Sequence, residues 1–169
     1  LDEPTAVLTP QESEALYEIM KRMTDEKHSI IFITHKMKEV MSLSDRITVL
    51  SRGKVMSTLH REETDSKKLA ELMIGNLEPQ DMAKVSEFLR KTVFEEGVET
   101  YSKGLKKEVK KSKLKVVLKD IHAVNDLGHH ALKGVSFEIH NGEILGMAGV
   151  SGNGQPELTD VLSGLRPVT

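Results

Sequence analysis

The feature that most constrains the fold is a short apolar run that leads into a glycine-rich loop and then into a helix. Residues 143–150 (EILGMAGV) suit a buried strand, and residues 149–155 (GVSGNGQ) form the loop. In residues 156–165 the apolar side chains recur on one helical face. Glycines between a buried strand and a helix start allow backbone N–H groups to converge on an anion. We therefore predict a phosphate-binding loop at 149–155, with a purely structural turn as the alternative.

The loop departs from the complete phosphate-binding motif at its last two positions. The complete motif requires Lys and then Ser or Thr after the final glycine. Gln155 and Pro156 occupy these positions. Gln supplies no cation for the outer phosphates, and Pro has no hydroxyl for Mg²⁺. If the loop binds a nucleotide, we expect a weakened site.

The other elements follow from apolar periodicity and turn residues. Thr9, Pro10 and Glu12 indicate a capping box at the start of a helix. Residues 29–34 (SIIFIT) form a continuous apolar run, which is typical of a strand buried on both faces of a parallel sheet. Residues 51–53 predict a hairpin turn. The apolar face of the first helix is expected to carry Leu16, Ile19, Met20 and Met23.

These elements together predict an α/β chain with parallel strands, helices and antiparallel β elements. In the short helix at 36–43 we expect Met37, Val40 and Met41 to face inward. Gly75 is placed to end a helix that Asp65 and Ser66 begin. The remaining predicted strands are 46–50, 54–59, 115–124 and 131–140.

Residues 76–113 differ from both flanks. They allow one amphipathic helix, and seven lysines and one glutamate lie between Lys103 and Lys115. We interpret this run as a solvated linker, with a phosphate-binding or lipid-facing patch as the alternative. Interleaved aromatics that would stack bases are missing, and the net charge is −2, so a nucleic-acid partner is not expected. The sequence contains no cysteine, which excludes thiol catalysis and disulfides.

Three polar side chains are candidates for chemistry. Asp2 and Glu3 are adjacent acids that can divide labour between a metal and an attacking water, although a solvated turn is the alternative interpretation. His35 follows an apolar run, where a structural histidine is the alternative. Ser151 has no candidate His and Asp partners in a nucleophile-elbow arrangement, which disfavours nucleophilic catalysis.

Several segments resemble motifs of the ATPase subunits of ABC transporters. Residues 1–5 (LDEPT) resemble the end of the Walker B motif, and residues 33–35 (ITH) are similar to the switch-histidine loop. Residues 45–54 resemble the hairpin that follows that loop, and residues 133–155 resemble the start of a second cassette. Residues 2–9 and 149–155 point more narrowly to the fused double-cassette ATPases of simple-sugar and nucleoside importers.

The resemblance implies a partial P-loop NTPase fold in three parts. Residues 1–75 would be the C-terminal half of a first cassette, 76–113 a linker and 114–169 the N-terminal part of a second cassette. The two outer parts are expected to be able to pack together as a composite, with Ile30–Thr34 near Ile144–Val150. We also expect an internal fragment that is inactive alone, since this family's ATP hydrolysis needs a Walker A motif facing a signature across two cassettes.

The same resemblance assigns roles to the candidate residues. Asp2 would help to hold Mg²⁺, Glu3 would polarise the attacking water, and His35 would contact the γ-phosphate of ATP and link the two cassettes. Residues 6–9 would meet the opposing cassette. The residues that would cradle the phosphates of the second nucleotide are Gly149, Ser151, Gly152, Asn153, Gly154 and Gln155.

The implied function is an ATP-hydrolysing subunit that energises import of a simple sugar or nucleoside. Its partners would be transmembrane permease subunits, a solute-binding protein and the opposing cassette, at the cytoplasmic face of the membrane. Two alternatives remain at this point. One is a non-transport ABC protein that acts on ribosomes or nucleic acid through the lysine run, and the other is a non-catalytic interaction module.

Overall fold

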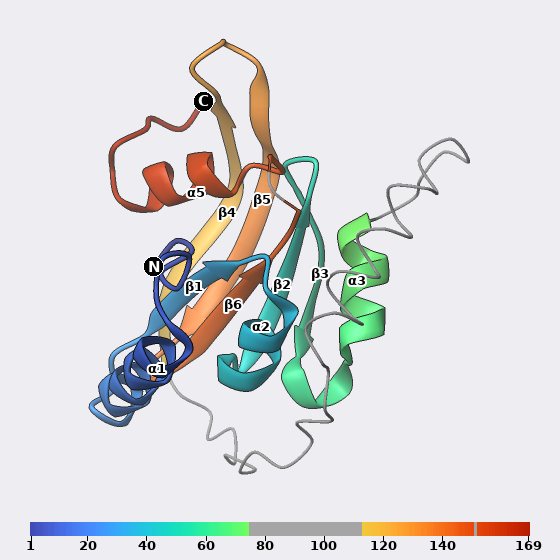
Figure 1. Ribbon diagram of the computed structural model, residues 1–169. Helices are drawn as coiled ribbons and strands as arrows, with labels where there is room; N and C mark the ends of the chain where they lie inside the picture. Colours follow the sequence, from blue (N-terminus) through green and yellow to red (C-terminus); the bar gives the residue numbers. More distant parts are fainter. Residues whose placement is uncertain (75–112, 151) are drawn as a thin grey trace.

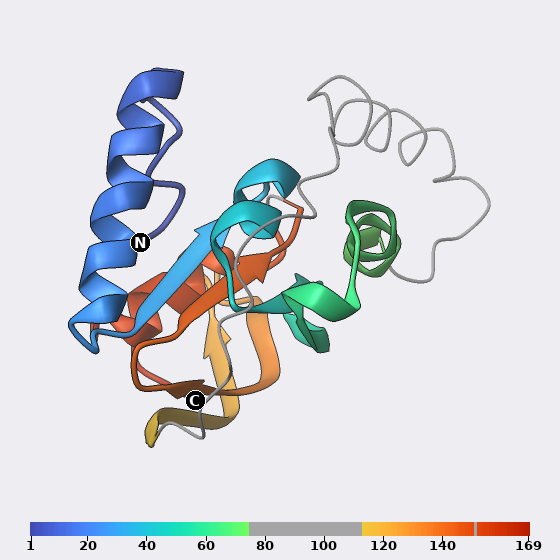
Figure 2. The same ribbon diagram turned by 90° about the horizontal axis from the view of Figure 1, so that it is seen from below.

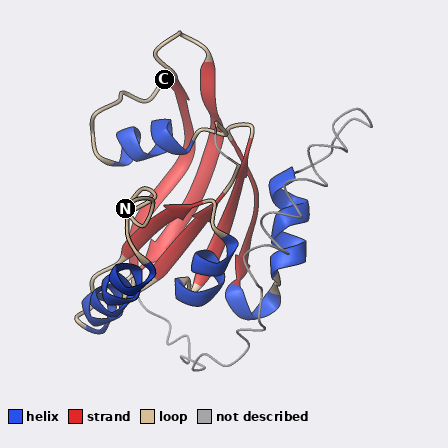
Figure 3. Cartoon of the chain, in the orientation of Figure 1, coloured by secondary structure: helices blue, strands red, loops and turns tan. Residues whose placement is uncertain are grey.

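The computed structural model describes residues 1–74, 113–150 and 152–169 as a central sheet with elements packed on both of its faces (Figures 1 and 3). The predicted amphipathic helix and most of the lysine run lie outside these residues, as do Gly75 and Ser151. The helices are α1 (Pro10–Asp25), α2 (Met37–Leu43), α3 (Ser66–Ile74) and α5 (Gln155–Leu162), with a 3-10 turn at Arg61–Glu63. The strands are β1 (Ile30–Thr34), β2 (Arg46–Ser51), β3 (Lys54–His60), β4 (Leu114–Val124), β5 (His130–His140) and β6 (Ile144–Ala148).

The central sheet combines strands from both ends of the chain. Its order is β1-β6-β2-β3, in which β6 runs parallel to β1 and β2, while β2 and β3 form the predicted antiparallel hairpin. Residues 1–3 extend the sheet, because Asp2 forms a parallel bridge with Ile33 on the outer side of β1. Strands β4 and β5 pair in a separate antiparallel sheet. The strand order therefore agrees with the composite packing expected from the sequence, since β6 lies directly beside β1.

The central sheet has helices α1, α2 and α3 on one side and the β4–β5 hairpin on the other (Figure 2), and side chains that alternate along the strands form a core on each face. On one face, Ile30 and Phe32 pack under α1, and Ile47 and Val49 pack under α2 and α3. On the other face, β1, β2 and β6 pack against the β4–β5 hairpin and α5, and the fully buried Leu145 belongs to this cluster. Three layers result, and the parallel strands are covered on both sides as buried parallel sheets require.

Polar contacts also join the two ends of the chain at the amino-terminal edge of the sheet. The Ile144 N–H donates to the Asp45 carboxylate at 2.8 Å. Arg46 Nη1 lies 3.0 Å from Glu143 Oε1, and both side chains are mostly buried. His140 Nδ1 lies 3.1 Å from the other Glu143 oxygen. These contacts hold residues 45–46 against the start of β6.

Helix α1 begins as the sequence predicts but is less buried than expected. Glu12 N–H donates to Thr9 Oγ1 at 3.3 Å and Thr9 N–H donates to Glu12 Oε2 at 2.8 Å, which confirms the capping box. Met20 of the predicted apolar face is buried, whereas Ile19 is 44% and Met23 is 40% exposed. The predicted apolar face therefore packs against the core, but only through part of its residues. Because α1 lies over the outer edge of the sheet, only a narrow stripe of the helix meets the core (Figure 1).

Asp65 precedes α3 and caps its amino terminus. Lys68 N–H donates to the Asp65 carboxylate at 2.8 Å, which confirms the predicted cap of α3. Among the residues that the structure describes, no helix is long and apolar enough to cross a membrane.

Candidate functional site

Three chain segments leave the central sheet at the same edge. Thr34 and Ala148 are aligned in the parallel pairing of β1 and β6, so His35 and Gly149 follow at the same level. The segment at 1–3 also runs parallel to β1, and Glu3 therefore leaves at that edge. The carboxyl edge of parallel strands is where ligands bind in open α/β sheets. The structure thus brings candidates from the two ends of the chain to one edge.

Glu3 and His35 contact each other directly. Glu3 has a positive φ of 39° and its N–H donates to Ile33 O at 2.9 Å, which anchors the turn beside β1. His35 Nδ1 lies 2.8 Å from Glu3 Oε1, and both side chains are about half exposed. A carboxylate only accepts hydrogen bonds, so Nδ1 carries the proton and Nε2 remains for another partner. The pair combines an acceptor for a water proton with an imidazole that can donate to an anionic group when Nε2 is also protonated.

A buried carboxylate that the sequence did not predict lies behind this pair. Glu39 in α2 is 5% exposed and accepts hydrogen bonds from the hydroxyls of Thr5 and Thr34, the latter at 3.0 Å. Lys36 Nζ lies 3.3 Å from Glu39 Oε1. Burial, followed by the negative charge of Glu39 and a hydrogen bond to it, raises the pKa of Tyr17 to about 12. Glu39 therefore gathers polar groups from α1, from the loop after Glu3 and from the loop of His35.

Periodicity could not reveal this role. Met37 and Val40 are buried as predicted, and Met41 is partly buried. An argument from apolar periodicity, however, treats the charged residue at position 39 as part of the polar surface. The sequence signal is weak, since it consists of a charged residue five positions after Thr34, which ends a buried apolar run.

The glycine-rich loop has the backbone of a phosphate cradle. Gly152 and Gly154 have positive φ values of 86° and 100°. A Cβ at Gly154 would lie 3.0 Å from Ala131 O, so this position needs glycine for both conformation and space. Helix α5 begins at the next residue, and its free N–H groups favour an anion.

Gln155 fills part of this cradle itself. The residue is 8% exposed, and its Oε1 accepts a hydrogen bond from Asn153 N–H at 3.0 Å. Its Nε2 donates to Val150 O at 2.9 Å, an oxygen that also accepts from Asn153 Nδ2 at 2.7 Å. The amide thus satisfies one of the loop N–H groups that would otherwise face a phosphate oxygen. A Cβ at Gly149 would lie 2.6 Å from Gln155 Nε2, so the conformation of the Gln155 side chain also depends on glycine at 149.

The turn between β2 and β3, which is distant in sequence, forms hydrogen bonds to the glycine-rich loop. Gly53 N–H donates to Asn153 O at 3.0 Å, and Arg52 N–H donates to Asn153 Oδ1. Lys133 N–H donates to Gly53 O at 2.8 Å. A Cβ at Gly53, whose φ is 77°, would lie 1.9 Å from Ala131 O, so a larger residue cannot occupy this position without a shift. The loop conformation therefore depends on packing between segments that are distant in sequence.

Asp2 is exposed and takes part in the bridge to Ile33. Within the described parts of the chain, no group of three or more His, Asp or Glu side chains is arranged to hold a metal ion. The assignments of Asp2 to Mg²⁺ and of the loop residues to phosphates remain predictions.

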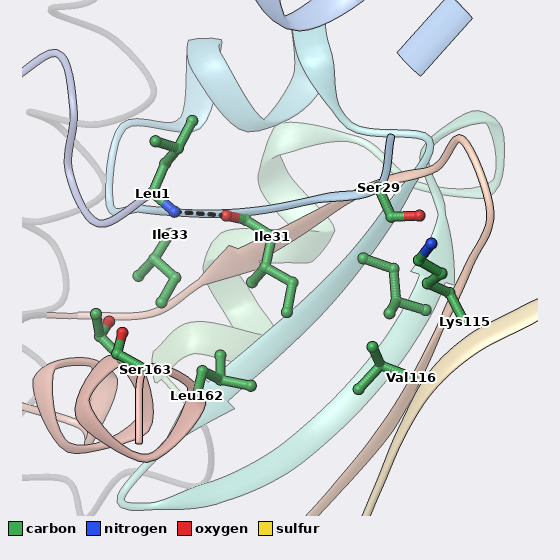
Figure 4. Close-up of a pocket in the computed structure, with 10 residues that line it drawn as sticks. Leu1, Ser29, Ile31, Ile33, Lys115, Val116, Leu162 and Ser163 are labelled. Carbon is green, nitrogen blue, oxygen red and sulfur yellow. Dashed lines mark hydrogen bonds between the residues drawn. The ribbon is translucent and has the colours of Figure 1, made fainter. Parts of the chain in front are cut away.

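A cavity of about 310 Å³ lies elsewhere, beside the outer strand of the sheet (Figure 4). Ile31, Ile33, Val116 and Leu162 contribute to its mainly apolar lining, and the Leu1 amino group donates to Ile31 O at 2.9 Å along its side. None of the predicted site residues lines this cavity. The phosphate-binding prediction therefore rests on the loop at the sheet edge and not on this cavity.

Comparison with known proteins reveals similarity along the whole chain. A glucose import ATP-binding protein of Haloferax volcanii is 40% identical over 169 residues, which is 100% of this chain and 27% of that protein. A nucleoside import ATP-binding protein of Lactococcus lactis is 37% identical over 99% of this chain and 29% of its own length. A guanosine import ATP-binding protein of Bacillus subtilis is 38% identical over 98% of this chain and 28% of its own length. The chain thus spans less than a third of the length of these relatives. No family model matches it, and no solved structure matches it significantly.

Proposed function

Because the chain belongs to the ABC family of sugar and nucleoside import ATP-binding proteins, we propose that it is part of an ATPase subunit that energises import of a simple sugar or a nucleoside. The observation that carries the proposal is the meeting of the glycine-rich loop and the Glu3–His35 pair at one edge of the sheet. A phosphate group held by the loop would lie on the same side of the sheet as a carboxylate and an imidazole.

The proposed division of labour follows the chemistry of each group. Backbone N–H groups of Gly152 and Gly154, together with the start of α5, would bind phosphate oxygens, while the Asn153 N–H donates to Gln155 Oε1. Glu3 would orient and polarise the attacking water, and His35, with a second proton on Nε2, would donate from that atom to the γ-phosphate. In the longer protein, residues 6–9 would face an opposing cassette.

The residues at the loop do not fit a complete Mg²⁺ site. Pro156 has no hydroxyl, Gln155 is neutral, and the exposed Asp2 is the single carboxylate that the sequence assigns to the metal. We therefore propose that the loop holds phosphates through its backbone N–H groups and the start of α5, and that this chain alone does not turn ATP over.

Permease subunits, a solute-binding protein and a place on the cytoplasmic face of the membrane are part of the same proposal. The three relatives described above are all named as import proteins, so the ribosome or nucleic-acid alternative gains no support from them. Most of the lysine run on which that alternative depends lies outside the described residues.

Calorimetric titration of the chain with ATP tests the proposal. We expect weak binding that depends little on Mg²⁺, with no phosphate release above background. Gly154→Ala should weaken binding at least tenfold, because it places a methyl group against Ala131 O at a φ of 100°. Gly164→Ala is the matched control, since Gly164 also has a positive φ but nothing lies within 4 Å of its Cβ position. Absence of ATP binding at millimolar concentration would refute the nucleotide site, and Mg²⁺-dependent turnover would refute the proposed inactivity.

A further inference from the structure

We propose that Glu39 is a positioning residue that holds Glu3 and His35 together at the edge of the sheet. The inference rests on the function proposed above, in which these two side chains act on a bound nucleotide. Glu39 itself would touch neither the nucleotide nor the attacking water.

Glu39 contacts both of the loops that carry the pair. Its Oε1 accepts a hydrogen bond from the hydroxyl of Thr5, which lies two residues after Glu3. Its Oε2 accepts a hydrogen bond from the hydroxyl of Thr34 at 3.0 Å, immediately before His35. One carboxylate therefore joins the two loops, with one oxygen for each.

Lys36 strengthens the same connection. Its Nζ lies 3.3 Å from Glu39 Oε1 and donates to Thr5 O at 3.2 Å. The side chains of Glu39, Thr5 and Thr34 are nearly inaccessible to solvent. Water cannot readily replace a lost acceptor at such a position, so removal of the carboxylate leaves buried hydroxyls without their partner.

The backbone pairing between residues 1–3 and β1 does not reach Thr5. The N–H of Glu3 donates to Ile33 O at 2.9 Å, and the positive φ of Glu3 then turns the chain away from β1. Beyond that turn, Thr5 is held by two side chains. Glu39 of α2 accepts from its hydroxyl, and Lys36, which precedes α2, donates to its carbonyl and hydroxyl oxygens. The side-chain network therefore continues the alignment where the bridge to β1 ends.

The consequence is a fixed state of the imidazole. Glu3 Oε1 is 2.8 Å from His35 Nδ1, and of the two neutral forms of the ring this contact favours the one with the proton on Nδ1. Nε2 then keeps a lone pair that can take a proton, and the protonated nitrogen can donate to an anionic ligand. In Glu39→Gln an amide NH2 replaces one carboxylate oxygen, so one threonine hydroxyl must turn round to accept instead of donate, and the ion pair with Lys36 is lost. The connection between the two loops should weaken, and Glu3 should no longer select a single form of the imidazole.

Long-range ¹H–¹⁵N NMR spectra of the labelled 169-residue chain test this inference, because they distinguish the Nδ1–H form from the Nε2–H form. The spectra are recorded about two pH units above the ordinary imidazole pKa of about 6.5. We expect the Nδ1–H form of His35 to dominate in the unmodified chain and a mixture in Glu39→Gln. Glu3→Ala provides the reference signal for a His35 that has lost its acceptor.

Glu143→Gln is the matched control. Glu143 is also a buried carboxylate paired with a basic side chain, but it lies at the opposite edge of the sheet. This variant should lose stability and keep the Nδ1–H signal of His35. Should Glu39→Gln fail to fold, Thr34→Val removes one of the two hydroxyls with little change of shape and should produce a mixture as well.

The inference is overturned if the folded Glu39 or Thr34 variant keeps the original His35 signal. It is equally overturned if Glu143→Gln changes that signal as much as the Glu39 or Thr34 variant does, because the effect would then follow stability alone. The measurement contains no nucleotide, so its outcome is independent of whether the chain binds ATP.

Discussion

At the scale of single residues, the side chain of Gln155 occupies part of the proposed phosphate-binding loop. Its amide occupies Asn153 N–H and Val150 O, and it brings no charge toward a ligand. A lysine at 155 would add a charge-assisted contact to phosphate, which contributes about 1.5–3 kcal/mol. We therefore expect Gln155→Lys to tighten ATP binding by about tenfold or more in a fluorescence titration. Gln11→Lys adds the same charge on the exposed side of α1, and an equal gain in that variant would show that the effect is only one of net charge.

At the scale of secondary-structure elements, the capping box of α1 makes a pH-dependent contribution to stability. Hydrogen bonds from the Thr9 backbone and then from its hydroxyl lower the pKa of Glu12 below its ordinary value of 4.5. A lowered folded-state pKa means that this stabilisation is complete above pH 4.5 and is lost as pH falls through the lower folded value. Urea unfolding should therefore find Glu12→Gln less stable at pH 7, with the difference shrinking below pH 4.5. Glu18→Gln on the same exposed helix should give no such pH-dependent difference; if it does, the effect belongs to helix charge and not to the cap.

The elements also show what could be predicted from sequence and what could not. Local patterns located β1, β6 and the β2–β3 hairpin, because continuous apolar runs and a short glycine turn are short-range signals. The insertion of β6 between β1 and β2 depends on pairing across about a hundred residues, which no local pattern encodes. From the sequence, the packing of the two ends of the chain against each other is therefore only a hypothesis. The burial of Glu39 depends on Thr5 and Thr34, which are 29 residues apart in sequence. Periodicity likewise could not show that α1 lies at the sheet edge with Ile19 exposed.

At the scale of the whole molecule, the composite sheet predicts that the two ends of the chain unfold together. Arg46 and Glu143 connect them, and their side chains are only 19% and 8% exposed. Arg46→Leu leaves the Glu143 carboxylate buried without its cation, which costs about 3 kcal/mol or more. Hydrogen exchange should then show β1 and β6 losing protection by the same factor, because each provides backbone partners for the other. Lys54→Met removes a positive charge from an exposed position of β3 and should change neither strand. If β6 kept its original protection in Arg46→Leu while β1 lost it, the two ends of the chain would be independent folding units and the shared phosphate edge would not exist as one site.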